Sequence, residues 1–170
     1  AYQKGGNEDT KGKVKKALTI CEQVIAANKG SIGFDNCTEL KKQILQKNLD
    51  FTVEEYLLPN ESFKVLTKYK NVDKVFVRVI QTTQKEYEEI KPSKESKRSY
   101  LKTSDYIQYY RNKDSQQKFQ TDLLLDGDHQ NHSTELVIND LEIGQYIVLI
   151  GSNAEMDYAK SNVAIQKVQV

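Results

Sequence analysis

The sequence predicts a mainly β protein, a seven-stranded antiparallel β-sandwich of immunoglobulin or fibronectin type that is preceded by an α-helical hairpin. Two observations predict this fold. Apolar and polar residues alternate with a period of two from Leu49 onward, whereas the apolar residues before Asn48 follow a helical period. In addition, a Leu-x-x-Gly-x-Tyr pattern at residues 141–146 stands directly before an apolar run, as at the tyrosine corner of such sandwiches.

The first 48 residues have the pattern of two amphipathic helices. Between Asp9 and Asn28, six residues at helical spacing fall on one face: Val14, Ala17, Leu18, Cys21, Val24 and Ile25. Asn36 and Glu39 have the spacing of a capping box, which predicts the start of a second helix. We therefore divide the chain into a hairpin at 1–48 and a sandwich at 49–170. Two helices cannot bury both of their faces, so the hairpin either leans on the sandwich or, as we favour, ends a longer helical array.

Seven strands follow, separated by turns that are rich in Asn, Asp, Gly and Ser. They are expected at residues 49–53, 63–69, 75–80, 119–125, 134–138, 145–150 and 162–170. No helical pattern recurs between successive strands, which argues against a parallel sheet built from βαβ units. Leu141, Gly144 and Tyr146 define the corner: the glycine turns the chain and the tyrosine hydroxyl returns to the upstream backbone.

The alternation fails in an insertion at about residues 85–115. This charged segment carries a set of tyrosines that we take as a candidate interaction loop: Tyr100, Tyr106, Tyr109 and Tyr110. Ser104 could cap one short helix that carries Ile107 and Tyr110. A connection of this length in a compact domain is uncommon and tends to be functional or mobile.

Charge and hydropathy exclude two classes of partner. Residues 1–48 hold nine lysines and five acids, and the remainder holds 16 basic and 19 acidic residues, so the net charge of +1 is the sum of +4 and −3. Neither part has the dense basic face of a nucleic-acid binder. No apolar run approaches the roughly 20 residues that a membrane span needs. We therefore expect neither nucleic acid nor a membrane span.

The residues offer little raw material for catalysis, and we expect no enzyme activity, cofactor or metal. Both histidines fall in one loop, at 126–132, where the Asp-Gly-Asp-His-Gln-Asn-His segment is better interpreted as a polar turn than as a cation loop because it lacks the EF-hand spacing. Cys21 and Gln23 are two residues apart and point to different sides of a helix, so they cannot form a thioester.

Cys21 and Cys37 lie on adjacent predicted helices and are either a disulfide, in an exported protein, or two buried thiols.

Four segments together resemble bacterial alpha-2-macroglobulin-like proteins of the Bacteroides type. The segments are 36–40 (Asn-Cys-x-x-Leu), 68–78 (Lys-Tyr-Lys-Asn-Val-Asp-Lys-Val-Phe-Val-Arg), 126–135 (Asp-Gly-Asp-His-Gln-Asn-His-Ser-Thr-Glu) and 141–146 (Leu-Glu-Ile-Gly-Gln-Tyr). The resemblance implies an early, N-terminal macroglobulin domain of a large exported protein in the periplasm or cell envelope. Such parents are thought to trap proteases, and the Cys-x-Glu-Gln thioester motif of the family does not occur here.

The resemblance therefore implies a non-catalytic structural domain. Its partners would be neighbouring domains of the same chain and, through the parent protein, proteases. The alternative is an independent adhesion module that binds glycans on the tyrosines of the 85–113 insertion, or one that binds peptides by adding a strand to a sheet edge.

Overall fold

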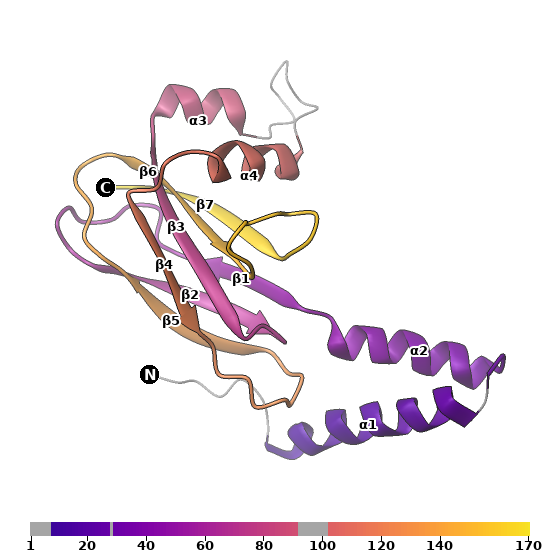
Figure 1. Cartoon of the computed structure of the whole chain (residues 1–170). Coiled ribbons are helices and arrows are strands. Elements are labelled where there is room, and N and C mark those ends of the chain that lie inside the picture. Colours follow the sequence, from indigo (N-terminus) through magenta and orange to yellow (C-terminus); the bar gives the residue numbers. More distant parts are fainter. Residues whose placement is uncertain (1–7, 28, 92–101) are drawn as a thin grey trace.

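The computed structural model describes residues 8–27, 29–91 and 102–170 (Figure 1). Seven antiparallel strands form two sheets that pack face to face, and two helices precede them. The predicted fold class is thus confirmed. Across the described part of the chain, no helix combines the length and apolar character that crossing a membrane requires.

The two sheets have three and four strands. The first sheet has the order β1-β2-β5 and the second the order β4-β3-β6-β7. The strands are β1 (Asn48–Thr52), β2 (Phe63–Lys70), β3 (Lys74–Thr82), β4 (Gln117–Asp122), β5 (His132–Ile138), β6 (Gln145–Gly151) and β7 (Val163–Gln169). The fourth strand pairs with the third strand and not with the first sheet, unlike the constant-type immunoglobulin arrangement.

The central strands β3 and β6 are apolar on both faces. On the inner face Val77 and Val148 belong to the core between the sheets, and on the outer face Ile80, Ile147 and Leu149 belong to a second core. Two short helices cover that outer face, α3 (Gln84–Ile90) and α4 (Thr103–Arg111), so the domain has three layers (Figure 1). The third layer explains why these strands lack a polar face.

The insertion between β3 and β4 differs from the prediction of one helix capped by Ser104. It contains both α3 and α4, and Ser104 lies inside α4. The carboxylate of Asp105 caps α4 by accepting a hydrogen bond from the Lys102 N–H at 2.9 Å. At the other end of α4, Arg78 reaches up from β3 and donates to the Arg111 carbonyl at 2.5 Å, which ties the helix C-terminus to the sheet.

The hairpin consists of α1 (Glu8–Ala27) and α2 (Ile32–Leu45), which extend away from the sandwich (Figure 1). The predicted start of the second helix at Asn36 was wrong, because Ser31 is the cap and accepts a hydrogen bond from the Phe34 N–H at 3.1 Å. Gly30, with φ of +81°, turns the chain sharply enough for α2 to begin at once. An ion pair of 2.9 Å between Lys41 and Glu22 joins the two helices.

Candidate functional site

The tyrosine corner has the geometry that its sequence spacing predicts. Tyr146 is fully buried and its hydroxyl donates to the Glu142 carbonyl at 3.0 Å. A Cβ on Gly144 would lie only 3.2 Å from that hydroxyl, so glycine leaves room for the ring to fold over the turn. Leu141 is buried in the core beneath. This corner fixes the chain where β6 begins, and its role is structural.

Side-chain hydrogen bonds join the hairpin to the sandwich, and one asparagine makes two of them. Asn71, in the turn between β2 and β3, donates to the carbonyls of Ile44 at 2.8 Å and Gln46 at 3.0 Å, at the end of α2. Its side-chain oxygen lies 2.8 Å from Nδ1 of His129, which must be the donor because the amide oxygen can only accept. Asn71 has φ of +53°, a conformation that asparagine tolerates better than most residues. We call this network the Asn71 joint.

The joint brings together two segments that are far apart in the sequence, the β2–β3 turn and the β4–β5 loop. The Tyr69 hydroxyl donates to the Leu124 carbonyl at 3.2 Å, and the Lys15 ammonium on α1 lies 3.3 Å from the Asp126 carbonyl. Both segments belong to the set that carries the family resemblance. The sequence alone gives no reason for the two segments to occur together. In the structure they contact each other, and both contact the hairpin.

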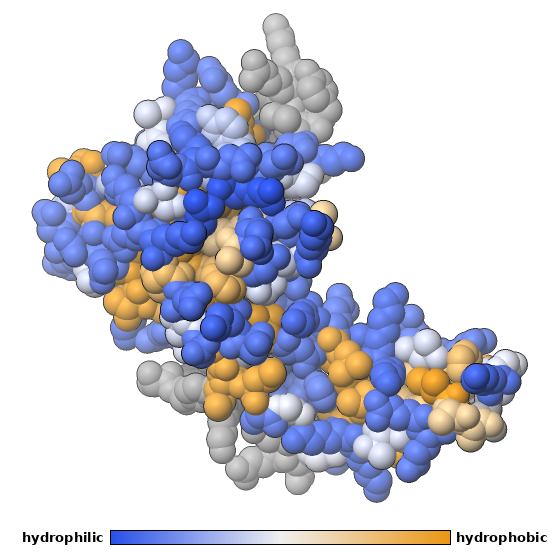
Figure 2. Space-filling model, in the orientation of Figure 1, coloured by the Kyte–Doolittle hydropathy of each residue, from blue (hydrophilic) through white to orange (hydrophobic). Residues whose placement is uncertain are grey.

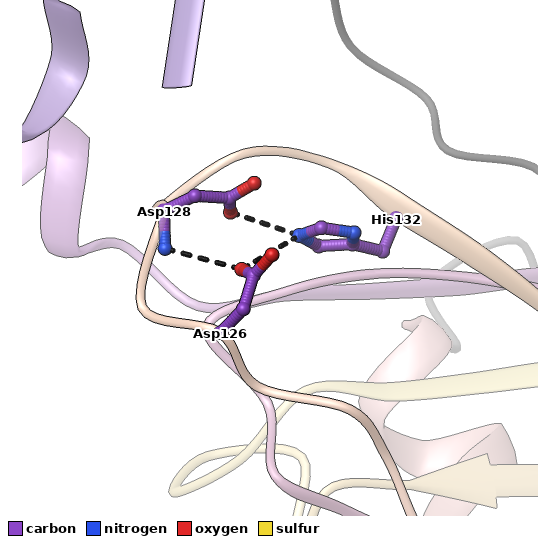
Figure 3. A group of neighbouring side chains, drawn as sticks. All are labelled: Asp126, Asp128 and His132. Atoms are coloured by element: carbon purple, nitrogen blue, oxygen red, sulfur yellow. Dashed lines mark hydrogen bonds and ion pairs between the residues drawn. The ribbon is translucent and has the colours of Figure 1, made fainter. Parts of the chain in front are cut away.

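Within the β4–β5 loop, Asp126, Asp128 and His132 point toward one another (Figure 3). Nε2 of His132 lies 2.9 Å from Oδ1 of Asp128 and 3.8 Å from Oδ1 of Asp126. Asp128 is 3% exposed and His132 is 9% exposed, so these two members are largely removed from solvent, whereas Asp126 is exposed. The loop is turned by Gly127 and His129, both with positive φ. The predicted polar turn is therefore present, and only one of its two histidines joins the cluster.

The tyrosines of the 85–115 insertion that the structure describes do not form an exposed platform. Tyr106 and Tyr110 are buried against the outer face of the second sheet, which contradicts their predicted role in an interaction loop. The reason is the apolar outer face of β3 and β6, which needs cover and receives it from α4. Tyr109 is 38% exposed and packs edge-on against Tyr110. Tyr100 lies outside the described residues.

Glu86 ties the two helices of this layer to β3. Its carboxylate accepts hydrogen bonds from Thr82 at 2.9 Å, from Tyr109 at 2.5 Å and from Lys113. Burial raises the pKa of Glu86, but these hydrogen bonds and the charge of Lys113 outweigh burial and lower the pKa to about 2. The hydrogen bond between Tyr109 and Glu86 raises the pKa of Tyr109 to about 12. This cluster stabilises the helical layer and offers no open site.

A shallow cleft of about 500 Å³ lies beside α3 and β7. Its aromatic residues are Tyr56, which is 69% exposed, and Tyr87. The ammonium groups of Lys91 and Lys167 lie 5.2 Å and 4.8 Å from the Tyr87 ring centre, so that ring already makes cation–π contacts. The cleft therefore presents one free aromatic ring, which is a weak platform for stacking a sugar.

Cys21 and Cys37 lie side by side in the hairpin as free thiols. Burial raises the pKa of Cys21, and a hydrogen bond with Cys37 adds to the effect. Their oxidation to a disulfide stays a prediction.

The hairpin exposes apolar side chains along its length (Figure 2). The exposed residues are Ile20, Ile32, Leu40 and Leu45. Ile32, at the start of α2, is 81% exposed. The contacts with the sandwich described above are hydrogen bonds, and these apolar side chains stay exposed.

Sequence reasoning missed the roles of Asn71 and Glu86. For Asn71 a signal existed, since an asparagine in a tight turn favours positive φ, but nothing local indicates that its side chain meets the end of a helix 25 residues earlier. For Glu86, one acid among many in a charged segment carries no signal of its own.

No family model matches the chain, and no curated protein matches it. Among solved structures, the CARDB domain of a protein from Pyrococcus furiosus, in complex with di-metal ions, is similar over 74% of this chain and 92% of that chain. The identity is 13% and the TM-score is 0.39. The fold and the site therefore stand on the chain's own residues.

Proposed function

We propose that this chain is a non-catalytic interaction domain in which the sandwich holds the α1–α2 hairpin as a contact surface. The observation that carries the proposal is the set of apolar side chains that the hairpin leaves exposed. Full burial of one such side chain is worth about 1.5–3 kcal/mol, so a partner that covered the four would gain several kcal/mol.

The way the hairpin is attached supports this function. Hydrophobic packing onto the sandwich would hide the apolar side chains, whereas Asn71 holds the end of α2 through two directional hydrogen bonds and is itself bonded to His129. Directional bonds fix an orientation while leaving the apolar surface free. The sandwich thus presents the hairpin.

The partner that fits best is a neighbouring helical unit of the same parent protein. Two-helix units stack on their neighbours in helical arrays and bury their apolar faces between successive units. The parent is a large exported protein of alpha-2-macroglobulin type that traps proteases, as the four-segment resemblance implies, and this domain contributes spacing and interdomain contacts. Contact between two of those segments at the Asn71 joint supports reading them as one set.

Site-specific photo-crosslinking in the full parent protein tests the contact surface. A photoreactive residue at Leu40, exposed on α2, should form an adduct with another domain of the parent. The matched control is the same residue at Lys118, which is exposed on β4, an edge strand of the second sheet. Equal yields at the two positions, or no adduct at either, would count against the hairpin as an interface.

The protease-trapping role is tested separately. The parent, incubated with a protease that cleaves it, should retain that protease during size-exclusion chromatography, whereas a catalytically inactivated protease should elute alone. Elution of the active protease away from the cleaved parent would remove this part of the proposal and leave the interaction role of the hairpin untouched.

The alternative of a glycan-binding module loses its structural basis. Its platform was to be the insertion tyrosines, and Tyr106 and Tyr110 are buried.

A further inference from the structure

We propose that Asp126, Asp128 and His132 bind one divalent transition-metal ion of the zinc class. The donor set is mixed, with one imidazole nitrogen and two carboxylate oxygens. Imidazole favours zinc and its neighbours, and carboxylates are accepted by the same ions. Calcium takes oxygen ligands and would use only part of this set. The inference does not rest on the proposed function of the hairpin.

The distances fit a single ion. Zinc lies about 2.0–2.2 Å from nitrogen and oxygen ligands, so ligand atoms around a tetrahedral ion are about 3.3 Å apart. Nε2 of His132 lies 2.9 Å from Oδ1 of Asp128 and 3.8 Å from Oδ1 of Asp126, which brackets that separation. The three donor atoms lie within 4.8 Å of one another, so shifts of up to about one ångström would bring them onto one centre. Three protein ligands leave a fourth position for water.

The surroundings hold the donors in place. The Asp128 N–H donates to Oδ1 of Asp126 at 3.3 Å, and the Gln130 N–H donates to Oδ1 of Asp128 at 2.9 Å. The Tyr69 ring packs against the His132 ring with centres 5.5 Å apart. Hydrogen bonds and packing of this kind orient metal ligands in known sites.

The site also has an entry path, because the ligands differ in exposure. The side chain of Asp126 is 33% exposed, whereas Asp128 and His132 are buried. An ion can therefore be taken first by Asp126 from solvent and passed to the two inner ligands. To bind the ion, Nε2 of His132 must present its lone pair, so the hydrogen of the neutral ring would lie on Nδ1.

Metal binding would reinforce the attachment of the hairpin. The same loop contacts Lys15 of α1 through the Asp126 carbonyl and Asn71 through His129. A metal that crosslinks the loop to the first residue of β5 would hold both contacts in place.

The test uses the whole chain, zinc as the probe, and NMR of the imidazole rings. The chain contains two histidines, so their ring signals are readily assigned with a His129→Gln variant. Zinc should shift the ring signals of His132 in a saturable way, leave those of His129 near their original positions, and bind at least about tenfold more tightly than calcium. This measurement needs no ligand mutation, so it remains decisive if a variant fails to fold.

Two variants give the matched comparison. Asp126→Asn keeps the bond between Asp128 and His132 and should weaken zinc binding at least about tenfold, since an amide oxygen is a poor zinc ligand. Asp122→Asn changes an exposed carboxylate at the end of β4 and should leave binding unchanged. The proposal is overturned if zinc causes no saturable shift of the ring signals, or if it shifts those of His129 as much as those of His132. It is also overturned if Asp126→Asn binds zinc as tightly as Asp122→Asn and the unmodified chain do.

Discussion

Glu86 gives the sharpest prediction, because its carboxylate accepts hydrogen bonds from three different segments, one in the sheet and two in the helical layer. Thr82 belongs to β3, Tyr109 to α4, and Lys113 to the segment that follows α4. Glu86→Gln removes the charge and half of the acceptor capacity while keeping the size of the side chain. The variant should weaken the attachment of α3 and α4 to the sheet.

The pKa gives the magnitude and the direction. The folded pKa of Glu86 is about 2, against an ordinary value of 4.5. Each unit of difference corresponds to about 1.4 kcal/mol, so the shift sets a ceiling of about 3 kcal/mol. With 21% of the side chain exposed, solvent screening reduces our expectation to about 2 kcal/mol. Because the folded pKa is lowered, this stability is present above pH 4.5 and is lost as the pH falls toward 2.

Urea denaturation between pH 2 and pH 6 measures the effect. At pH 6 the free energy of unfolding of the unmodified chain should exceed that of Glu86→Gln by about 2 kcal/mol, and the gap should close as the pH approaches 2. The comparison cancels the contributions of other carboxylates, such as Glu135, whose pKa is lowered by its hydrogen bond with Lys64.

Glu89→Gln is the matched control, since Glu89 is an exposed carboxylate on the same helix. It should change the free energy of unfolding by less than about 0.5 kcal/mol at every pH. A gap between the unmodified chain and Glu86→Gln that stays constant from pH 6 to pH 2 would refute the reasoning, because the titration of Glu86 would then contribute nothing.

Three further outcomes are expected. Asn71→Asp keeps the size of the side chain and the positive φ of the turn, but its carboxylate cannot donate to the carbonyls at the end of α2. The hairpin should then tumble more independently of the sandwich, as ¹⁵N relaxation measures. Unchanged relaxation would contradict the role of the Asn71 joint. Tyr146→Phe removes the corner hydrogen bond and should lower the free energy of unfolding by about 1–2 kcal/mol in urea, whereas Tyr158→Phe at an exposed site should have no effect. With oxidised glutathione, Cys21 and Cys37 should form one disulfide, seen by mass spectrometry as the loss of two hydrogens, and persistence of both free thiols would oppose the pairing.

The sandwich could be predicted because its signal is local and repeated. In β3 and β6 alternate residues face the inner core, and the spacing of Gly144 and Tyr146 specifies the corner without reference to the rest of the chain. The period-two pattern marks where strands lie, but their ends depend on distant partners. For example, the extent of β4 depends on its pairing with β3, in which Lys74 lies opposite Asp122 and the preceding Asp73 carbonyl accepts a hydrogen bond from the Leu123 N–H at 2.8 Å.

The helical layer was predicted only in part, although the sequence contains a signal for it. Tyr106, Ile107 and Tyr110 have helical spacing, and the outer faces of β3 and β6 are apolar at Ile80 and Leu149. An apolar outer face requires a third layer, and the long insertion is the segment placed to provide it. The prediction placed the tyrosines on the surface because it treated the insertion separately from the sheet that the insertion covers.

The Asn71 joint could not be predicted, because each of its parts has an ordinary local explanation. Asn71 looks like a turn residue, the 126–132 segment looks like a polar loop, and Ile44 ends a helix. Their meeting depends on the register that places Tyr69 opposite His132, a pairing between strands that are 63 positions apart. Once that register is set, the loop and the turn share one end of the first sheet, and the end of α2 accepts hydrogen bonds there from Asn71 and the neighbouring Lys70. The direction of the hairpin, and hence the surface it offers a partner, thus follows from sheet register more than from any property of the helices.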